Sequence, residues 1–140
     1  MGAVYDNAIQ ALYEHGITAG TTADCTASST CNTGGSDFRF CPLDPASRSQ
    51  LAVFVWRADH RSSTCPSCPS SRYFCDSNSA GSACGCIEGL HDDGVVEGGM
   101  SSCSASSCTG LQYCPLDTAL RLHAMVMLAK ATGATLPCMP

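Results

Sequence analysis

The residues with the widest chemical repertoire in this chain are its cysteines, which number 12 among 140 residues. An even number of cysteines spread through Ser-, Thr- and Gly-rich segments is typical of disulfide pairing in an exported protein. The spacing leaves the connectivity open. We expect every cysteine to form a disulfide: Cys25, Cys31, Cys41, Cys65, Cys68, Cys75, Cys84, Cys86, Cys103, Cys108, Cys114 and Cys138.

Four of these cysteines allow a different chemistry, because Cys65-x-x-Cys68 and Cys84-x-Cys86 form two closely spaced pairs. Structural zinc needs four converging ligands, which often come from two C-x-x-C units. Here the second pair is one residue shorter, and the first lies in a Ser/Pro-rich segment rather than at a strand-to-helix junction. The pattern favours structural disulfides and predicts no cofactor. A Cys-based metal-binding or thiol-redox protein is the rival hypothesis.

Two arginines occupy matched positions in an internal repeat, at the start of a predicted helix in each copy. They are Arg48 and Arg121. A guanidinium binds a carboxylate with two parallel hydrogen bonds, so such a residue suits an acidic sugar. The alternative is an internal salt bridge or a capping contact to a loop carbonyl. The sequence leaves both interpretations open.

No pattern in the chain predicts a catalytic site. The four histidines share no metal-ligand spacing, and neither a Gly-x-Ser-x-Gly motif nor a phosphate-binding glycine loop is present. The only tryptophan, Trp56, lies in an apolar run, which indicates core packing rather than sugar stacking. We therefore expect a protein that is not an enzyme.

Charge and hydropathy exclude two classes of partner. The net charge is −5 and Lys130 is the only lysine, so binding to nucleic acid or to an anionic membrane surface is not expected. No apolar run approaches 18 residues, so no membrane span is expected either. The first residues lack the basic and apolar regions of a signal peptide. We interpret the chain as a mature or excised segment of an exported protein.

The repeat becomes visible when the chain is aligned with itself. Cys25 and Cys103 are 78 residues apart, whereas Cys41 and Cys114 are 73 apart, so the copies differ in length in a Ser/Thr/Gly-rich loop. Such a repeat indicates stacked supersecondary units that share one core. The periodicity predicts first helices over 6–15 and 85–93. It predicts second helices over 51–56 and 124–131, each preceded by an N-cap aspartate, Asp44 or Asp117.

These residues resemble the S-layer homology family. The resemblance is carried by Gly16-Ile17-Thr18-Ala19-Gly20, by the turn Phe40-Cys41-Pro42, and by the run from Arg48 through Gln50-Leu51-Ala52-Val53-Phe54-Val55 to Ala58. The second copy is more degenerate. The resemblance implies a non-catalytic bacterial surface module that holds exported proteins to cell-wall polysaccharide, with a glycan-contacting arginine at Arg48 and Arg121.

We therefore expect an all-α fold of two helix-loop-helix repeats with long loops, cross-linked by disulfides. The repeats span 1–60 and 84–140, and a Ser/Pro/Cys-rich linker spans 61–83. The expected location is extracellular or at the cell surface. The expected partners are cell-wall polysaccharide or copies of the chain itself.

The alternative function is a self-assembling subunit of an extracellular filament. The second helix of each copy is apolar nearly all round, and two repeats bury less of it than the three that the family usually has. One such face is then left for a neighbouring molecule, as in a homo-oligomer or filament.

Overall fold

The structure is a computed structural model that describes residues 3–20, 31–32, 39–41, 44–100, 102–104 and 108–133. These residues form α1 (Ala3–Glu14), α2 (Arg48–His60), the 3-10 segment η1 (Ser77–Ala83), α3 (Cys84–Asp92) and α4 (Arg121–Ala131). The predicted helical fold is confirmed. The departure is a short antiparallel ladder of β1 (Cys31–Asn32) and β2 (Arg39–Phe40), which pairs Cys31 with Phe40.

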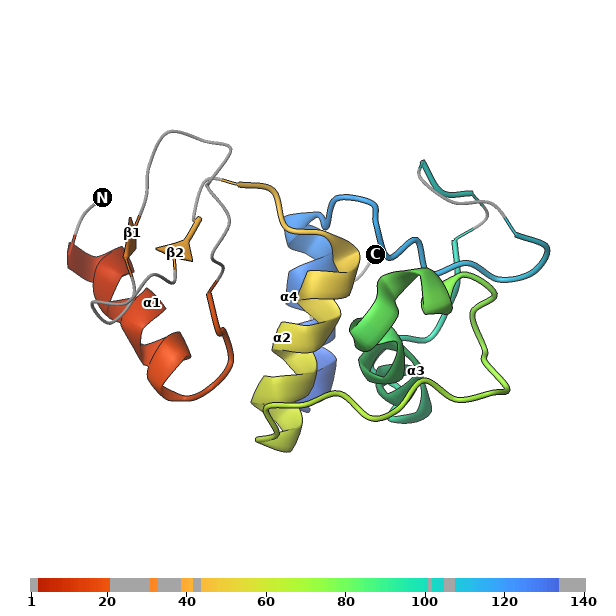
Figure 1. Cartoon of the computed structure of the whole chain (residues 1–140), viewed down its shortest axis with the longest axis horizontal. Coiled ribbons are helices and arrows are strands. Elements are labelled where there is room, and N and C mark those ends of the chain that lie inside the picture. The colour runs from red at the N-terminus through yellow and green to blue at the C-terminus, as the bar shows by residue number, and fades with distance from the viewer. Residues whose placement is uncertain are drawn as a thin grey trace. The chain divides into compact units, whose positions relative to one another are not determined.

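Contacts divide the chain into two compact units, Met1–Pro45 and Ala46–Pro140. The first contains α1 and the ladder. In the second, α2 packs against η1, α3 and α4 (Figure 1). The division falls inside the predicted first repeat, because α2 packs with helices of the second copy rather than belonging to the unit of α1. The repeat boundaries 1–60, 61–83 and 84–140 stay a prediction, and η1 lies within the predicted linker.

The internal repeat recurs at the carboxyl ends of α1 and α3. In each copy a glycine in the left-handed region ends the helix, Gly16 at φ 70° and Gly94 at φ 73°. The next two amides donate to the leucine carbonyl of the last turn: Ile17 and Thr18 to Leu12 at 2.9 and 3.3 Å, Val95 and Val96 to Leu90 at 2.9 and 3.1 Å. The two copies therefore terminate their first helices with the same backbone hydrogen bonds.

The predicted N-caps of the second helices are wrong. Ser47 caps α2: its hydroxyl accepts from the Gln50 amide at 3.2 Å, while the Gln50 side chain accepts from the Ser47 amide at 2.8 Å. Leu120 holds the N-cap position of α4 without a side-chain bond. Asp44 and Asp117 instead belong to preceding turns, where their amides donate to Cys41 O and Cys114 O. The two helices thus begin three residues later than the predicted N-cap aspartates indicated.

The hydrophobic core of the second unit lies where α2, α3 and α4 meet. Buried apolar side chains from α2, α3, α4 and the intervening loops meet there: Leu51, Ala52, Val55, Phe74, Ile87, Leu90, Val95, Val96, Tyr113 and Met127. Burying an aliphatic or aromatic side chain of this kind contributes about 1.5–3 kcal/mol. Among the described residues, no helix has the length and apolar character required to cross a bilayer.

Candidate functional site

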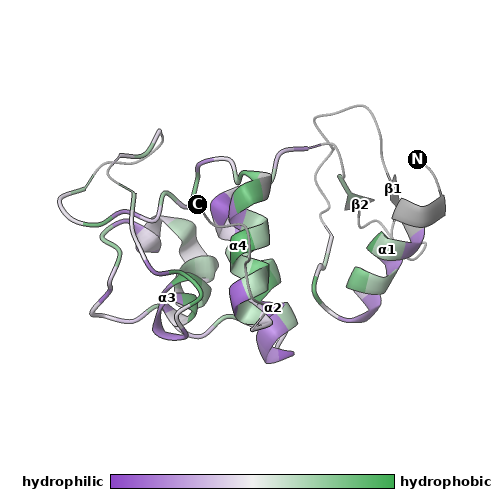
Figure 2. Ribbon diagram, turned by 180° about the vertical axis from the view of Figure 1, so that it is seen from behind, coloured by the Kyte–Doolittle hydropathy of each residue, from purple (hydrophilic) through white to green (hydrophobic). Residues whose placement is uncertain are grey.

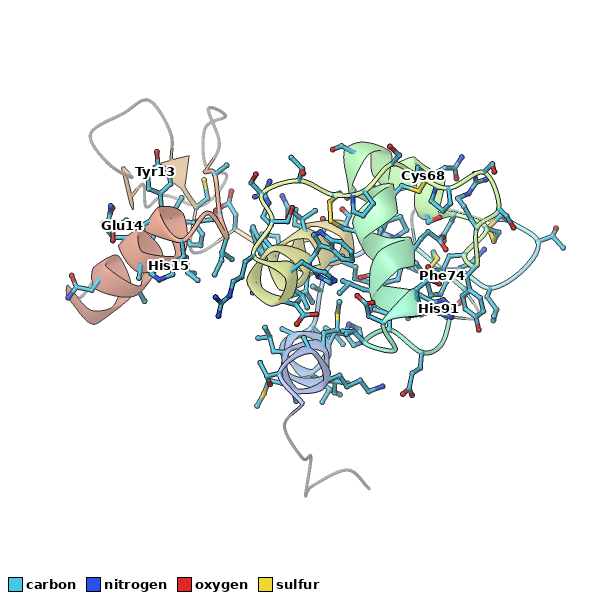
Figure 3. All side chains as sticks on the ribbon, turned by 90° about the horizontal axis from the view of Figure 1, so that it is seen from below. Tyr13, Glu14, His15, Cys68, Phe74 and His91 are labelled. Atoms are coloured by element: carbon cyan, nitrogen blue, oxygen red, sulfur yellow. A yellow bond between two sulfur atoms is a disulfide. The ribbon has the colours of Figure 1, made fainter. Side chains whose placement is uncertain are left out.

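Two disulfides fasten the linker to the start of α3. Cys65 pairs with Cys86 and Cys68 pairs with Cys84. The four cysteines of the rival metal or redox hypothesis are thus paired in two disulfides, each of which joins the linker to α3. This is the structural alternative that the sequence favoured. Figure 3 shows Cys68 on the segment that runs beside α3.

Two further disulfides organise the second copy. Cys103 pairs with Cys114, while Cys108 bonds to Cys75. One cysteine of the second copy, Cys108, therefore bonds to the predicted linker rather than within its own loop. In the first copy Cys41 is also disulfide-bonded. Cys25, Cys138 and the side chain of Cys31 lie outside the described residues.

Arg48, the first predicted glycan ligand, is 8% exposed at the start of α2. Its Nε donates to Tyr113 O at 2.8 Å, and its guanidinium carbon lies 4.6 Å from the centroid of the Tyr113 ring. Its Nη1 lies 2.9 Å from His123 Nδ1. In return, the Tyr113 hydroxyl donates to Arg48 O at 3.1 Å. Arg48 thus joins the second helix of one copy to the turn and second helix of the other.

This junction changes the ionisation of two neighbours. Burial raises the pKa of Tyr113 from 10.0 to about 12, although the Arg48 charge acts in the opposite direction. Partial burial, together with the positive charge of Arg48, lowers the pKa of His123. A neutral His123 can accept from Nη1 at Nδ1, whereas a protonated ring presents a second donor. The junction therefore favours neutral forms of both side chains.

Arg121, the second predicted ligand, begins α4 as expected, but its side chain lies outside the described residues. The contacts of Arg48 are those of the internal capping alternative. Glycan contact through Arg48 and Arg121 stays a prediction.

Two buried carboxylates were missed by sequence reasoning. Glu88, on α3, accepts from the amides of Tyr73 and Phe74 at 2.8 and 3.2 Å and from Ser77 Oγ at 2.5 Å. Asp76 accepts from the amides of Tyr113 and Cys114 at 2.7 and 2.9 Å. Glu88 is 5% and Asp76 4% exposed. Each carboxylate thus satisfies backbone donors of a loop, which is a structural role.

Aromatic rings stack around His91 and His60. Tyr73 stacks on His91 with centroids 3.6 Å apart, and Phe74 meets the same ring edge-on at 5.6 Å (Figure 3). Trp56 packs partly against the core, as predicted, and stacks on His60 at 3.6 Å. These contacts account for the two histidine rings as packing groups.

An exposed acidic cluster lies beside this stack. His60 Nε2 is 3.0 Å from an Asp93 carboxylate oxygen, and Asp59 lies close enough for the three groups to hold a metal ion. The sequence separates Asp93 from Asp59 and His60, so no local spacing pattern revealed this arrangement. Exposed groups of this kind are common without a metal.

The most conspicuous surface is an apolar face of α4, which we define as Leu122, Met125 and Leu128. These side chains are 66%, 68% and 45% exposed, while Met127 on the same helix is 6% exposed and faces the core. Figure 2 shows apolar residues along most of α4. A helix that is apolar on both its core side and its outer side is typical of a buried element. The second unit thus leaves part of a core-type helix in solvent.

No protein-family model, curated protein or solved structure matches this chain. The resemblance to the S-layer homology family therefore depends on the quoted residues alone.

Proposed function

We propose that this chain is a non-catalytic, exported structural protein that builds an extracellular layer or filament by self-association. The observation that carries the proposal is the α4 face, where three large apolar side chains of one helix are exposed. Large apolar side chains gathered on one exposed helix face are typical of an interaction surface. The four described disulfides cross-link residues 65–114 of the same unit, so α4 follows directly on a covalently constrained segment.

Attachment to polysaccharide is the weaker candidate on the described contacts. Its first ligand, Arg48, is buried and binds Tyr113 and His123. A sugar that took the same guanidinium would compete with hydrogen bonds that join the two copies. Self-association needs no such rearrangement, because the side chains of the α4 face are already at the surface. The location fits as well, since disulfides persist in oxidising extracellular compartments.

Sedimentation velocity on the oxidised protein, over a hundredfold range of concentration, tests the proposal. The parent should show a weight-average sedimentation coefficient that rises with concentration. Leu128→Glu should remain monomeric, because association would then bury an unpaired carboxylate. Leu111→Glu is the matched control, since Leu111 is 46% exposed, against 45% for Leu128, and is not part of α4.

Circular dichroism should give the same helical signal for the parent and both variants. If the parent sediments as a monomer throughout, or if the two leucine variants associate equally, the α4 face does not mediate assembly and the proposal fails.

A further inference from the structure

We infer that the α4 face binds helix α1 of a second copy, in the manner in which α3 packs on α2. This inference rests on the proposed function and names the partner surface that it requires. The template is the α2–α3 contact inside the second unit, where a second helix of the repeat is covered by a first helix. The internal repeat then indicates which residues of α4 and α1 correspond to that contact.

The corresponding positions on α2 and α4 differ sharply in burial. With the 73-residue offset that relates the second helices, Ala52 corresponds to Met125 and Val55 to Leu128. Ala52 and Val55 are 0% exposed, whereas Met125 and Leu128 are 68% and 45% exposed. The sequence thus keeps these α4 positions apolar although nothing within the second unit buries them. A covering helix is the element that α2 has and α4 lacks.

The covering surface of α3 has its counterpart on α1. Gly89 of α3 lies against the Trp56 ring, since a Cβ placed there would be 2.5 Å from Trp56 Cζ3. With the 78-residue offset of the first helices, Gly89 corresponds to Ala11, and Leu90, which is 0% exposed, corresponds to Leu12, which is 38% exposed. Ala8 and Ala11 are exposed on the same side of α1 as Leu12. We name Ala8, Ala11 and Leu12 the α1 face.

Size also matches across the proposed contact. Trp56 corresponds to Ala129 and Gly89 to Ala11, so the ring that lies against a glycine in one pair of helices is replaced by two alanines in the other. Two small side chains permit close approach of the helices.

The direction of the repeat identifies a second copy as the source of α1. In the second unit the covering helix α3 follows α2 in the chain, so a second helix is covered by the first helix of the next repeat. Helix α1 precedes α4 in its own chain, so an α1 that covers α4 in this same order belongs to a second copy. Such a contact joins two different surfaces, is heterologous, and runs on into rings or filaments.

Two single variants test the inference by complementation in sedimentation velocity. Leu12→Glu removes the α1 face and Met125→Glu removes the α4 face, so each variant alone should be monomeric at concentrations where the parent associates. In an equimolar mixture, the intact α4 face of Leu12→Glu should bind the intact α1 face of Met125→Glu. The complex should stop at two chains, because the two faces that are left over are both disrupted. Leu12→Met, which keeps an apolar side chain, should associate like the parent.

The outcomes separate the inference from the proposed function. If Leu12→Glu associates like the parent while Met125→Glu does not, α4 binds some other surface, and only the inference fails. A parent that is monomeric throughout overturns both. Ala11→Glu, on the same face of α1, replaces Leu12→Glu if circular dichroism shows that the first variant has lost helix; continued association of Ala11→Glu would equally contradict the inference.

Discussion

Gly85 lies between the two cysteines that fasten α3 to the linker, and its replacement by alanine tests the packing of this clamp. A Cβ at Gly85 would lie 1.8 Å from Pro66 O and 3.1 Å from Ser67 O. A relaxed carbon–oxygen contact is about 3.3 Å, so the linker backbone must retreat by roughly 1.5 Å. It cannot do so freely, because Cys65 and Cys68 on either side are bonded to α3.

The expected magnitude follows from two opposing terms. Overpacking a closely packed site costs about 1–3 kcal/mol, and a clash with backbone held by disulfides belongs at the upper end. Replacing glycine by alanine within a helix contributes about 1 kcal/mol in the opposite direction. The net loss is then about 2 kcal/mol, which lowers the melting temperature of a unit of this size by roughly 10 °C.

Thermal unfolding of the oxidised protein, followed by circular dichroism at pH 7, measures this change. Gly98→Ala is the matched control, because a Cβ there meets nothing within 4 Å and Gly98 is not among the glycines with positive φ. The control should melt within about 3 °C of the parent, since surface substitutions change stability by about 0.5 kcal/mol at most. A Gly85→Ala variant that melts at or above the parent temperature would refute the packing argument.

Three further predictions concern polar side chains that are buried or partly buried. The pKa of His123 is lowered in the folded state, so the unfolded chain binds more protons than the folded chain as the pH falls below about 6.5, and the free energy of unfolding should decrease. Chemical denaturation at pH 7 and pH 5 should show a smaller decrease in this free energy for His123→Gln than for the parent. The pKa of Tyr113 is raised from 10.0 to about 12, so about 3 kcal/mol of stability should be lost as the pH rises from 10 to 12; spectrophotometric titration should show this delayed tyrosinate, and Tyr113→Phe should abolish it. Glu88→Gln should lower the free energy of urea unfolding by about 1–3 kcal/mol, because the glutamine NH₂ group would face the N–H and O–H donors that Glu88 now accepts from. Glu97→Gln, whose side chain is 72% exposed, should leave this free energy nearly unchanged.

The sequence by itself determined the local structure of the repeated segments. The first helices end close to the predicted positions 15 and 93, where Gly16 and Gly94 follow. Glycine reaches the left-handed conformation at low cost, and this preference acts over a few residues. The predicted second helices over 51–56 and 124–131 lie within α2 and α4. Local propensity was less successful at the second helices, where Ser47 rather than Asp44 is the cap of α2.

Only the tertiary structure decided which surfaces meet. Contacts such as Arg48 with Tyr113, or Asp76 with the amides of 113 and 114, join residues far apart in the chain, and no local spacing encodes them. The same holds for the disulfide partners, because a cysteine pairs with whichever thiol the fold brings within bonding distance. Burial is likewise a property of the assembled helices. Val55 and Leu128 occupy equivalent repeat positions, yet Val55 is buried in the core where α2 packs with η1, α3 and α4, and Leu128 is exposed.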